Sequence, residues 1–235
     1  MKLKTVCILC ARGGSKGIRN KNLKLVDGKP LIFYPIKAAQ MSGVIDNIVV
    51  STDSKKIASY AKKIGAEVPF LRPKKLSGDL ITTEATLKYS LLKYEEIKKK
   101  KFDICVFLTA TDIFRKVSWI TKSVKILKSN KKLDSVFSGY KTHKNFWELK
   151  NNKWIRLRSW MRNYSSRQVR RYIVREDTGI ACASRAYLWR NGKRIGDKVE
   201  IIQNNAPFTS IDIHEPIDLK MANFAMKIWK RNLYK

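Results

Sequence analysis

The chain has few acidic residues, few prolines and no long hydrophobic run. Its 235 residues include 19 Asp and Glu against 50 Lys and Arg, which gives a formal net charge of +31. The first apolar run spans only Val6 to Cys10, whereas a membrane-spanning helix needs about 20 residues, so we expect neither a secretory signal nor a transmembrane span. With six prolines and no low-complexity tract, the composition favours one globular domain over residues 1–235.

Cysteine and histidine are also scarce, which excludes two further classes of protein. The chain has two histidines and four cysteines, the latter being Cys7, Cys10, Cys105 and Cys182. All four lie in apolar, strand-like contexts, so we expect buried thiols in a cytoplasmic protein rather than a secreted disulfide framework. Cys7 and Cys10 would point to opposite faces of one strand, and no second pair or histidine cluster completes a zinc site.

The large positive charge raises the alternative of a nucleic-acid-binding protein, because such a chain attracts polyanions non-specifically. The lysines, however, are spread over expected helical faces, as in 98–101 and 122–132. They are not gathered with aromatic residues on one platform, which single-strand binders require. We therefore expect no specific nucleic-acid partner and no membrane partner.

Strand and helix patterns alternate along most of the chain, which predicts an α/β fold with a mainly parallel sheet. Apolar runs predict strands at 6–10, 45–50, 67–71, 104–108, 135–137, 179–183, 199–202 and 208–213. Helical spacing of apolar residues predicts helices at 31–41, after a cap at Asp53 or Ser54, after a cap at Thr83, around 120–127, near 184–190 and from Pro216 onward.

The alternation breaks between Tyr140 and Arg175, where aromatic side chains alternate with basic ones. Its three tryptophans need a surface to cover, because their exposure carries a hydrophobic cost. We therefore expect residues 140–175 to form an inserted dimerisation arm that contacts the second subunit of a homodimer.

The segment after the first expected strand is glycine-rich and basic, a composition that suits phosphate binding. Glycine lets the backbone approach a ligand closely, and the three glycines here are Gly13, Gly14 and Gly17. The basic side chains that can neutralise several phosphates at once are Arg12, Lys16, Arg19 and Lys21. The spacing fits neither a P-loop nor a dinucleotide-binding fingerprint, so the loop predicts a polyanion site of another kind.

The stretch ARGGSKGIRNKN, residues 11–22, resembles the signature of the CMP-sialic acid synthetase (acylneuraminate cytidylyltransferase) family, to which the CMP-Kdo synthetases are more distantly related. Similarity continues at 27–32, 49–73 and 210–213 and so spans nearly the whole chain. The resemblance implies a three-layer, Rossmann-like nucleotide-diphospho-sugar transferase fold. It also implies transfer of CMP from CTP to the anomeric hydroxyl of a nonulosonic (sialic-acid-like) 2-keto sugar acid, with release of pyrophosphate.

The same resemblance implies roles for individual residues. Those expected to bind the nucleotide are Arg12, Gly13, Gly14, Ser15, Lys16, Lys21, Asn22 and Arg72. Arg72 would lie beside the cytosine. The residues expected to serve catalysis are Arg12, Lys16 and Asp212.

The expected metal site departs from the family, in which two aspartates separated by one residue share Mg²⁺. Here the sequence is Asp212-Ile213-His214, and histidine suits Mg²⁺ poorly because this ion prefers oxygen ligands. Water and triphosphate oxygens could complete the site, or Glu215 or Asp218 could reach the ion. Alternatively the ion is Mn²⁺ with His214 as a ligand, or His214 bonds to the backbone at the start of the last helix.

The expected sugar pocket departs further. The family's Leu-Gln-Pro-Thr-Ser-Pro-Leu-Arg corresponds here to Leu108-Thr109-Ala110-Thr111-Asp112-Ile113-Phe114-Arg115, so Thr109 replaces a glutamine that contacts the sugar and Arg115 is retained. Arg167 and Gln168 lie in the arm, and the resemblance implies that Arg167 binds the carboxylate of a sugar whose nucleotide sits on the other subunit. Thr178 replaces an asparagine. The two losses of an amide side chain indicate a different acyl or deoxy pattern on the sugar.

Two alternative functions remain open at this point. One is a nucleotidyltransferase of the same fold that uses another sugar, such as Kdo. The other is a non-catalytic relative that binds nucleotide or RNA, because the chain is strongly basic and lacks the second aspartate.

Overall fold

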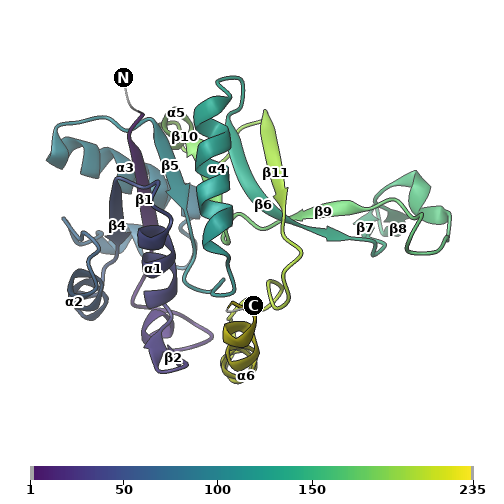
Figure 1. Cartoon of the computed structure of the whole chain (residues 1–235), viewed down its shortest axis with the longest axis horizontal. Coiled ribbons are helices and arrows are strands. Elements are labelled where there is room, and N and C mark those ends of the chain that lie inside the picture. The colour runs from purple at the N-terminus through teal and green to yellow at the C-terminus, as the bar shows by residue number, and fades with distance from the viewer. Residues whose placement is uncertain (1–2, 234–235) are drawn as a thin grey trace.

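The apolar run at the start of the chain forms β1 (Thr5–Cys10). It pairs in parallel with β4 (Asn47–Ser51) on one side and with β5 (Ile104–Phe107) on the other. The computed structural model describes residues 3–233, with side chains through residue 229, and Figure 1 shows how the elements are arranged.

Beyond β5 the sheet continues through β10 (Cys182–Arg185), β6 (Ser135–Thr142) and β11 (Val199–Gln203). β11 runs parallel to β6, whereas β10 is antiparallel to both of its neighbours. β9 (Ile173–Glu176) pairs antiparallel with the last residues of β6. The predicted α/β fold with a mainly parallel sheet is therefore confirmed, and β9 and β10 are the exceptions to the parallel order.

Helices pack on both faces of the sheet and so create three layers. The helices that share a core with Cys7 and Leu9 of β1 are α1 (Phe33–Met41), α2 (Lys55–Lys63), α4 (Val117–Ser129) and α6 (Pro216–Leu233). On the opposite face, α3 (Thr83–Lys98) and α5 (Ala186–Arg190) pack over Val6 and Ile8. This division follows from the alternation of side chains along a strand.

Short elements surround the carboxyl ends of the strands. The 3₁₀ turn η1 (Lys21–Leu23) leads into a hairpin of β2 (Leu25–Val26) and β3 (Lys29–Pro30), and β2 contacts α6. A second 3₁₀ turn, η2 (Lys74–Leu76), precedes α3. Both 3₁₀ turns contribute residues to the same cavity.

Between β6 and β9 the chain leaves the body as a projecting arm, residues 143–172, which extends to the right in Figure 1. The predicted arm, 140–175, also included the ends of these two strands. It contains a hairpin of β7 (Trp147–Lys150) and β8 (Lys153–Arg156), followed by the 3₁₀ turn η3 (Ser159–Arg162). The arm interrupts the α/β pattern where the alternation breaks in the sequence.

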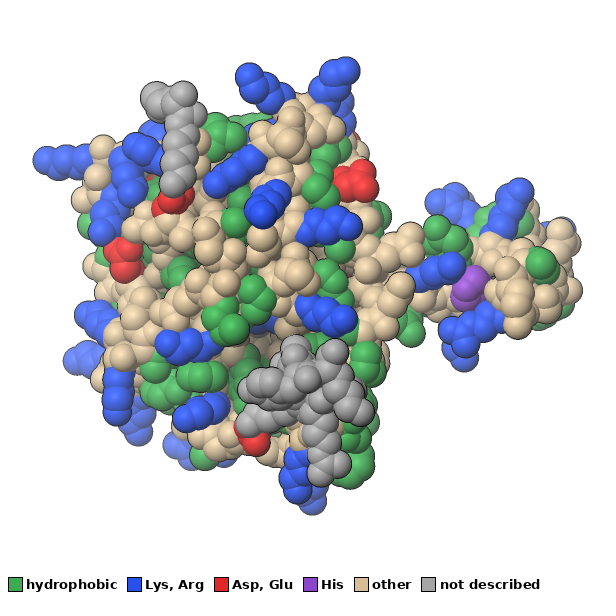
Figure 2. Space-filling model, in the orientation of Figure 1, with side chains coloured by type: hydrophobic (Ala, Val, Ile, Leu, Met, Phe, Trp, Pro, Cys, Tyr) green, Lys and Arg blue, Asp and Glu red, His purple; other side chains and the backbone are tan. Residues whose placement is uncertain are grey.

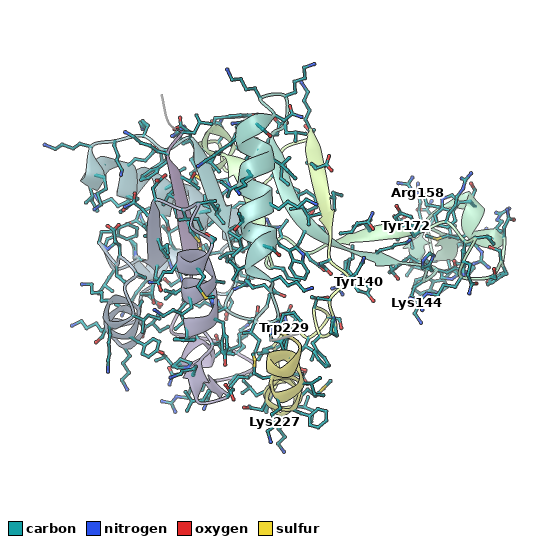
Figure 3. The ribbon with its side chains drawn as sticks, viewed as in Figure 1. Tyr140, Lys144, Arg158, Tyr172, Lys227 and Trp229 are labelled. Carbon is teal, nitrogen blue, oxygen red and sulfur yellow. The ribbon has the colours of Figure 1, made fainter. Side chains whose placement is uncertain are left out.

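Aromatic and basic side chains dominate the arm. Trp154 is 66% exposed and Tyr164 is 72% exposed. The Arg156 guanidinium lies 4.2 Å from the centre of the Trp147 ring, a cation–π contact. Figure 3 shows Tyr172 where the arm joins β9, and its hydroxyl accepts a hydrogen bond from Gln203 of β11 at 3.4 Å. The arm therefore presents a large aromatic surface without a covering layer from its own chain.

Two predicted strands are absent from the sheet. Residues 67–71 make only isolated bridges, one to β4 and one just beyond it. Residues 208–213 form no strand, because Phe208 adopts a left-handed backbone conformation with φ 67°. Ile211 then donates its N–H to the Phe208 carbonyl at 3.0 Å, which makes a turn.

Side-chain caps fix where two helices begin. Ser54 accepts the N–H of Ile57 at 3.4 Å and starts α2, as predicted. Thr82 accepts the N–H of Ala85 at 3.1 Å, so the cap of α3 is one residue earlier than the predicted Thr83. Such bonds satisfy backbone donors that have no partner in the first helical turn.

All four cysteines are free thiols. Burial raises the pKa of Cys10 to about 11 and that of Cys182 to about 12, so these thiols stay protonated. Cys7 belongs to the core on one face of the sheet, and Cys10 packs against the core on the other. The prediction that this pair lies on opposite faces of β1 is confirmed.

The basic residues are distributed over the surface. Figure 2 shows lysine and arginine side chains spread over the visible face of the body and over the arm, without one concentrated patch. No helix within residues 3–233 is long and apolar enough to cross a bilayer.

Candidate functional site

A cavity of about 540 Å³ opens at the carboxyl ends of β1 and β5, where open α/β sheets usually bind ligands. From the loop after β1 it receives Arg12, Ser15, Lys16, Gly17, Lys21 and Asn22. The opposite wall, from the region before and at the start of α3, includes Arg72, Ser77, Asp79, Thr83 and Thr86. This first cavity gathers most of the residues predicted to bind a nucleotide.

Hydrogen bonds hold the basic loop in place. Asn22 is buried and donates an Nδ2–H to the Arg12 carbonyl at 2.9 Å, which closes the loop. Lys21 donates from Nζ to the Ile213 carbonyl at 2.8 Å, which ties the loop to the segment before α6. Burial lowers the pKa of Lys21, and the nearby Asp212 carboxylate opposes this shift. The loop is therefore fixed both by its own end and by a distant part of the chain.

The three glycines of the loop have different surroundings. Gly13 donates its N–H to the Asp53 carboxylate at 2.8 Å, so this N–H is already used, and neither Gly13 nor Gly14 lines the first cavity. A Cβ on Gly14 would meet nothing within 4 Å, whereas a Cβ on Gly17 would lie 2.3 Å from the His214 carbonyl oxygen. Of the three, Gly17 is therefore the position at which the cavity wall leaves no room for a side chain.

Two cations of the loop share one carboxylate. Asp79 lies 2.8 Å from Arg12 and 3.2 Å from Lys16. The hydrogen bond from Lys16 is the main cause that lowers the pKa of Asp79. A single anionic group thus bridges both basic side chains, as one phosphate group can.

Arg72 is a buried residue rather than a surface one, with 5% of the residue exposed. Its backbone N–H bonds to the Thr52 carbonyl at 2.8 Å, and its Nε–H is donated to the Ser77 hydroxyl at 3.1 Å. A guanidinium carries five N–H donors. The others remain available for a ligand in the first cavity, which Arg72 lines.

A second cavity, of about 460 Å³, adjoins the first. The residues that line both are Thr83, Thr109, Thr111 and His214. The predicted sugar-binding residues Thr109 and Thr178 line the second cavity, together with Asp212. Because the cavities share a wall, they could hold two substrates in contact, which a transfer reaction needs.

Asp212 and His214 form a hydrogen-bonded pair, with His214 Nε2 2.7 Å from Asp212 Oδ2. Asp218 accepts the backbone N–H groups of His214 and Glu215, each at 2.8 Å, and so holds the first turn of α6. Of the predicted pair, Asp212 suits Mg²⁺ and His214 does not. Among the described side chains, no group of three His, Cys, Asp or Glu is arranged to hold a metal ion.

The profile of the cytidylyltransferase family matches residues 6–222 of this chain. The chain belongs to this family. Two relatives, both CMP-N,N'-diacetyllegionaminic acid synthases, are 31% identical to it. The one from Campylobacter jejuni matches over 95% of both chains, and the one from Legionella pneumophila over 96% of this chain and 97% of its own length.

Among solved structures, the complex of CMP:2-keto-3-deoxy-manno-octonic acid synthetase with CTP is similar, with a TM-score of 0.69 over 95% of this chain and 98% of that one. Its sequence is 14% identical, so the likeness concerns the fold. The predicted three-layer, Rossmann-like fold of the nucleotide-diphospho-sugar transferases is confirmed.

In this cytidylyltransferase Arg115 lies beneath the second cavity and is not part of its lining. Its Nη2 donates to the carbonyls of Thr109 at 2.7 Å and Gly179 at 2.9 Å, and its Nε donates to the Ile180 carbonyl at 3.0 Å. Burial lowers the pKa of Arg115 to about 10. The side chain thus joins two backbone segments that support the cavity, and its buried Nη1 has no hydrogen-bond partner among the described residues. The predicted direct contact with the sugar stays a prediction.

Arg167 and Gln168 are exposed on the arm and line neither cavity of their own chain. Arg167 was predicted to bind the substrate of the other subunit. That role requires Arg167 to lie outside the cavities of its own chain.

Several residues of the cavities were missed in the sequence, among them Asp79, Thr83 and Asp112. Asp79 and Thr83 line the first cavity but lie in a stretch without a recognisable motif. Thr83 was predicted only as a helix cap, because a threonine before a helical pattern is typical of a helix start. Asp112, in the segment compared with the family, lines the second cavity. The sequence signal for Asp112 was that an acidic residue stands where the family's motif has a serine.

Proposed function

We propose that this enzyme transfers CMP from CTP to the anomeric hydroxyl of a nonulosonic acid and releases pyrophosphate. The observation that carries the proposal is the pair of adjoining cavities, the first lined by loop cations and the second by residues predicted for the sugar. Relatives that match nearly the full length are named for a legionaminic acid. This favours a nonulosonic acid over Kdo, since the Kdo enzyme shares only the fold.

In the first cavity, Arg12 and Lys16 would bind the triphosphate in the place now taken by the Asp79 carboxylate. Asn22 uses an amide N–H in its bond to Arg12, which leaves its oxygen as an acceptor. That oxygen can accept a hydrogen bond from the amino group of cytosine but not from the carbonyl of uracil. Arg72 supplies further donors beside the base.

In the reaction, the sugar oxygen forms a bond to the α-phosphorus, and the bond from this phosphorus to the bridging oxygen of pyrophosphate breaks. The proton of the sugar hydroxyl passes to solvent. Arg12 and Lys16 stabilise the negative charge on the departing pyrophosphate. Asp212 would hold a divalent ion, Mg²⁺ or in its place Mn²⁺, which when bound supplies further charge neutralisation at the phosphates.

We also propose that the enzyme is a cytoplasmic homodimer. The exposed aromatic surface of the arm supports a partner that covers it, and the exposed position of Arg167 supports a role in the partner's second cavity. The free thiols support a reducing compartment.

The test is pyrophosphate release in mixtures of one triphosphate, Mg²⁺ and one sugar acid. We expect turnover with CTP and a nonulosonic acid, and at least about tenfold less with UTP, because one base-specific hydrogen bond is lost. Kdo should support little turnover. Equal rates with CTP and UTP, or a preference for Kdo over every nonulosonic acid, would contradict the proposal.

A further inference from the structure

Four acidic side chains line the second cavity, and three of them have a basic partner. These pairs are Asp177 with Arg175 (2.7 Å), Glu176 with Arg194 (3.4 Å) and Asp212 with His214 (2.7 Å). The fourth acid is Asp112. Among the described side chains, Asp112 is therefore the one of these four acids that no Lys, Arg or His faces within ion-pair distance.

Asp112 is held by neutral contacts. Its Oδ2 accepts a hydrogen bond from the Thr109 hydroxyl, and no ion pair among the described side chains includes it. Arg115 is three residues further along the chain, but its hydrogen bonds go to backbone carbonyls. Burial raises the pKa of Asp112, while Thr109 and then Arg115 oppose this shift. The carboxylate is thus poorly solvated and has no cation in contact.

The opposite backbone leaves room for this carboxylate. A Cβ on Gly179 would lie 2.2 Å from Asp112 Oδ2 and 2.8 Å from the Thr109 hydroxyl oxygen. Such distances are too short for any side chain, so Asp112 and Thr109 can keep these positions only because residue 179 is glycine. The place of the Asp112 carboxylate is therefore built into the cavity wall.

A partly buried carboxylate such as that of Asp112 is stabilised more by a cation than by a neutral donor, since removing its charge from water is costly. The carboxylate of the sugar acid cannot lie there, because two like charges repel. A protonated nitrogen on the sugar fits this position, and an amidine can offer two parallel N–H donors as a guanidinium does. In the segment compared with the family, the residue that corresponds to Asp112 is an uncharged serine. The preference for a positively charged group at this position is therefore a feature in which this chain departs from the family's motif.

We propose that Asp112 is a specificity-determining residue that binds a positively charged nitrogen substituent, of the amine or amidine class, on the acceptor sugar. This inference rests on the proposed transfer of CMP to a nonulosonic acid.

The experiment compares pairs of nonulosonic acids that differ in one substituent. One member carries an N-acetyl group, and the other carries the nearly isosteric N-acetimidoyl group, an amidine that is protonated at neutral pH. Each nitrogen-bearing carbon is tested in turn. We expect kcat/KM of the unmodified enzyme to favour the amidine of at least one pair by about tenfold or more, as expected for a site whose charged group would otherwise stay unpaired.

Asp112→Asn keeps the shape of the side chain and removes its charge, and Asp112→Ser introduces the family's residue. Both should lower the ratio of kcat/KM for the amidine to kcat/KM for the N-acetyl sugar by about tenfold. Glu96→Gln is the matched control, because Glu96 is 69% exposed at the end of α3 and pairs with Lys93. It removes one negative charge outside both cavities and should alter neither sugar.

The outcomes are distinct. Turnover of both sugars at equal rates, unchanged by the Asp112 variants, overturns the inference and leaves the proposed function intact. Turnover of neither sugar contradicts the proposed function itself. If both Asp112 variants instead lose activity with every acceptor and also lose binding of Mn²⁺ measured by electron paramagnetic resonance, Asp112 is a metal ligand and the inference is wrong.

Discussion

The two cavities obtain their charged groups in different ways. In the first, Arg12, Lys16 and Lys21 come from one continuous loop, whose shape is set by the Asn22 and Lys21 hydrogen bonds. In the second, most of the lining comes from three separated segments, 109–112, 175–179 and 209–214, and Thr83, Phe107 and Arg194 complete it. The cations proposed to bind the nucleotide thus come mainly from one local segment, whereas the residues proposed to select the acceptor are distributed over the fold.

This difference also concerns charge. The first cavity has an excess of cations with one carboxylate between two of them, Asp79. In the second cavity Asp177 and Glu176 pair with arginines and Asp212 bonds to His214, whereas Asp112 has no basic partner among the described side chains. The first suits a generic polyanion, and the second suits a particular sugar. Mutations in the two should therefore affect different substrates.

The largest expected effect follows from removing two cations of the first cavity. Arg12→Ala combined with Lys16→Ala should lower kcat/KM for CTP by about 100-fold or more, because two charge-assisted contacts of roughly 1.5–3 kcal/mol each are lost. The melting temperature should change little, since neither side chain belongs to the hydrophobic core. Arg19→Ala is the control, because Arg19 is exposed in the same loop and does not line the cavity. An equal loss in the control would mean that general charge, and not this site, binds CTP.

A smaller but clear effect is expected from mixing two damaged proteins. Lys16→Ala disables the first cavity of its own subunit, and Arg167→Ala disables the second cavity of the partner. After joint unfolding and refolding, about half of the dimers should be mixed, with one intact site in each, so activity should return to about a quarter of the unmodified level. Proven mixed dimers without recovered activity would show that Arg167 acts within its own chain.

The smallest effect is expected from removing the carboxylate of Asp79, which forms ion pairs with Arg12 and Lys16. Asp79→Asn should tighten CTP binding by about two- to fivefold, since the triphosphate no longer competes with an exposed ion pair. Glu96→Gln changes the net charge equally at a site outside the cavity and should leave binding unchanged. Isothermal titration calorimetry measures both. Weaker binding in Asp79→Asn would mean that Asp79 supports the bound nucleotide instead of yielding to it.

The sequence was sufficient to predict the α/β alternation and the position of the basic loop at a cavity, because both depend on neighbouring residues. Apolar runs such as that of β1 form strands, and a basic loop at a strand's end faces the ligand side of the sheet. Ser54 was a correct cap because its hydroxyl acts within three residues. The strand predicted at 208–213 was wrong, because the left-handed backbone at Phe208 is incompatible with a strand despite the apolar pattern.

The second cavity could be predicted only in part, because contacts between distant residues decide it. Arg115 was predicted to bind the sugar, and only the fold shows that its Nε and Nη2 bond to backbone carbonyls while its buried Nη1 has no hydrogen-bond partner among the described residues. The importance of Asp112 depends on which acids of the cavity have basic partners, and only the fold reveals that. Gly179 is required by the carboxylate and hydroxyl opposite it, which lie about 70 residues away in the chain.

The most direct test of the account is to follow the α-phosphate of CTP. The enzyme is incubated with Mg²⁺, a nonulosonic acid that it accepts and CTP carrying radioactive phosphorus at the α position, and the products are separated and identified by mass spectrometry. The account predicts that the label appears in a CMP-sugar, in equal amount to the unlabelled pyrophosphate released. Label found in free CMP, or a sugar that has received the γ-phosphate instead, would contradict the transfer of CMP.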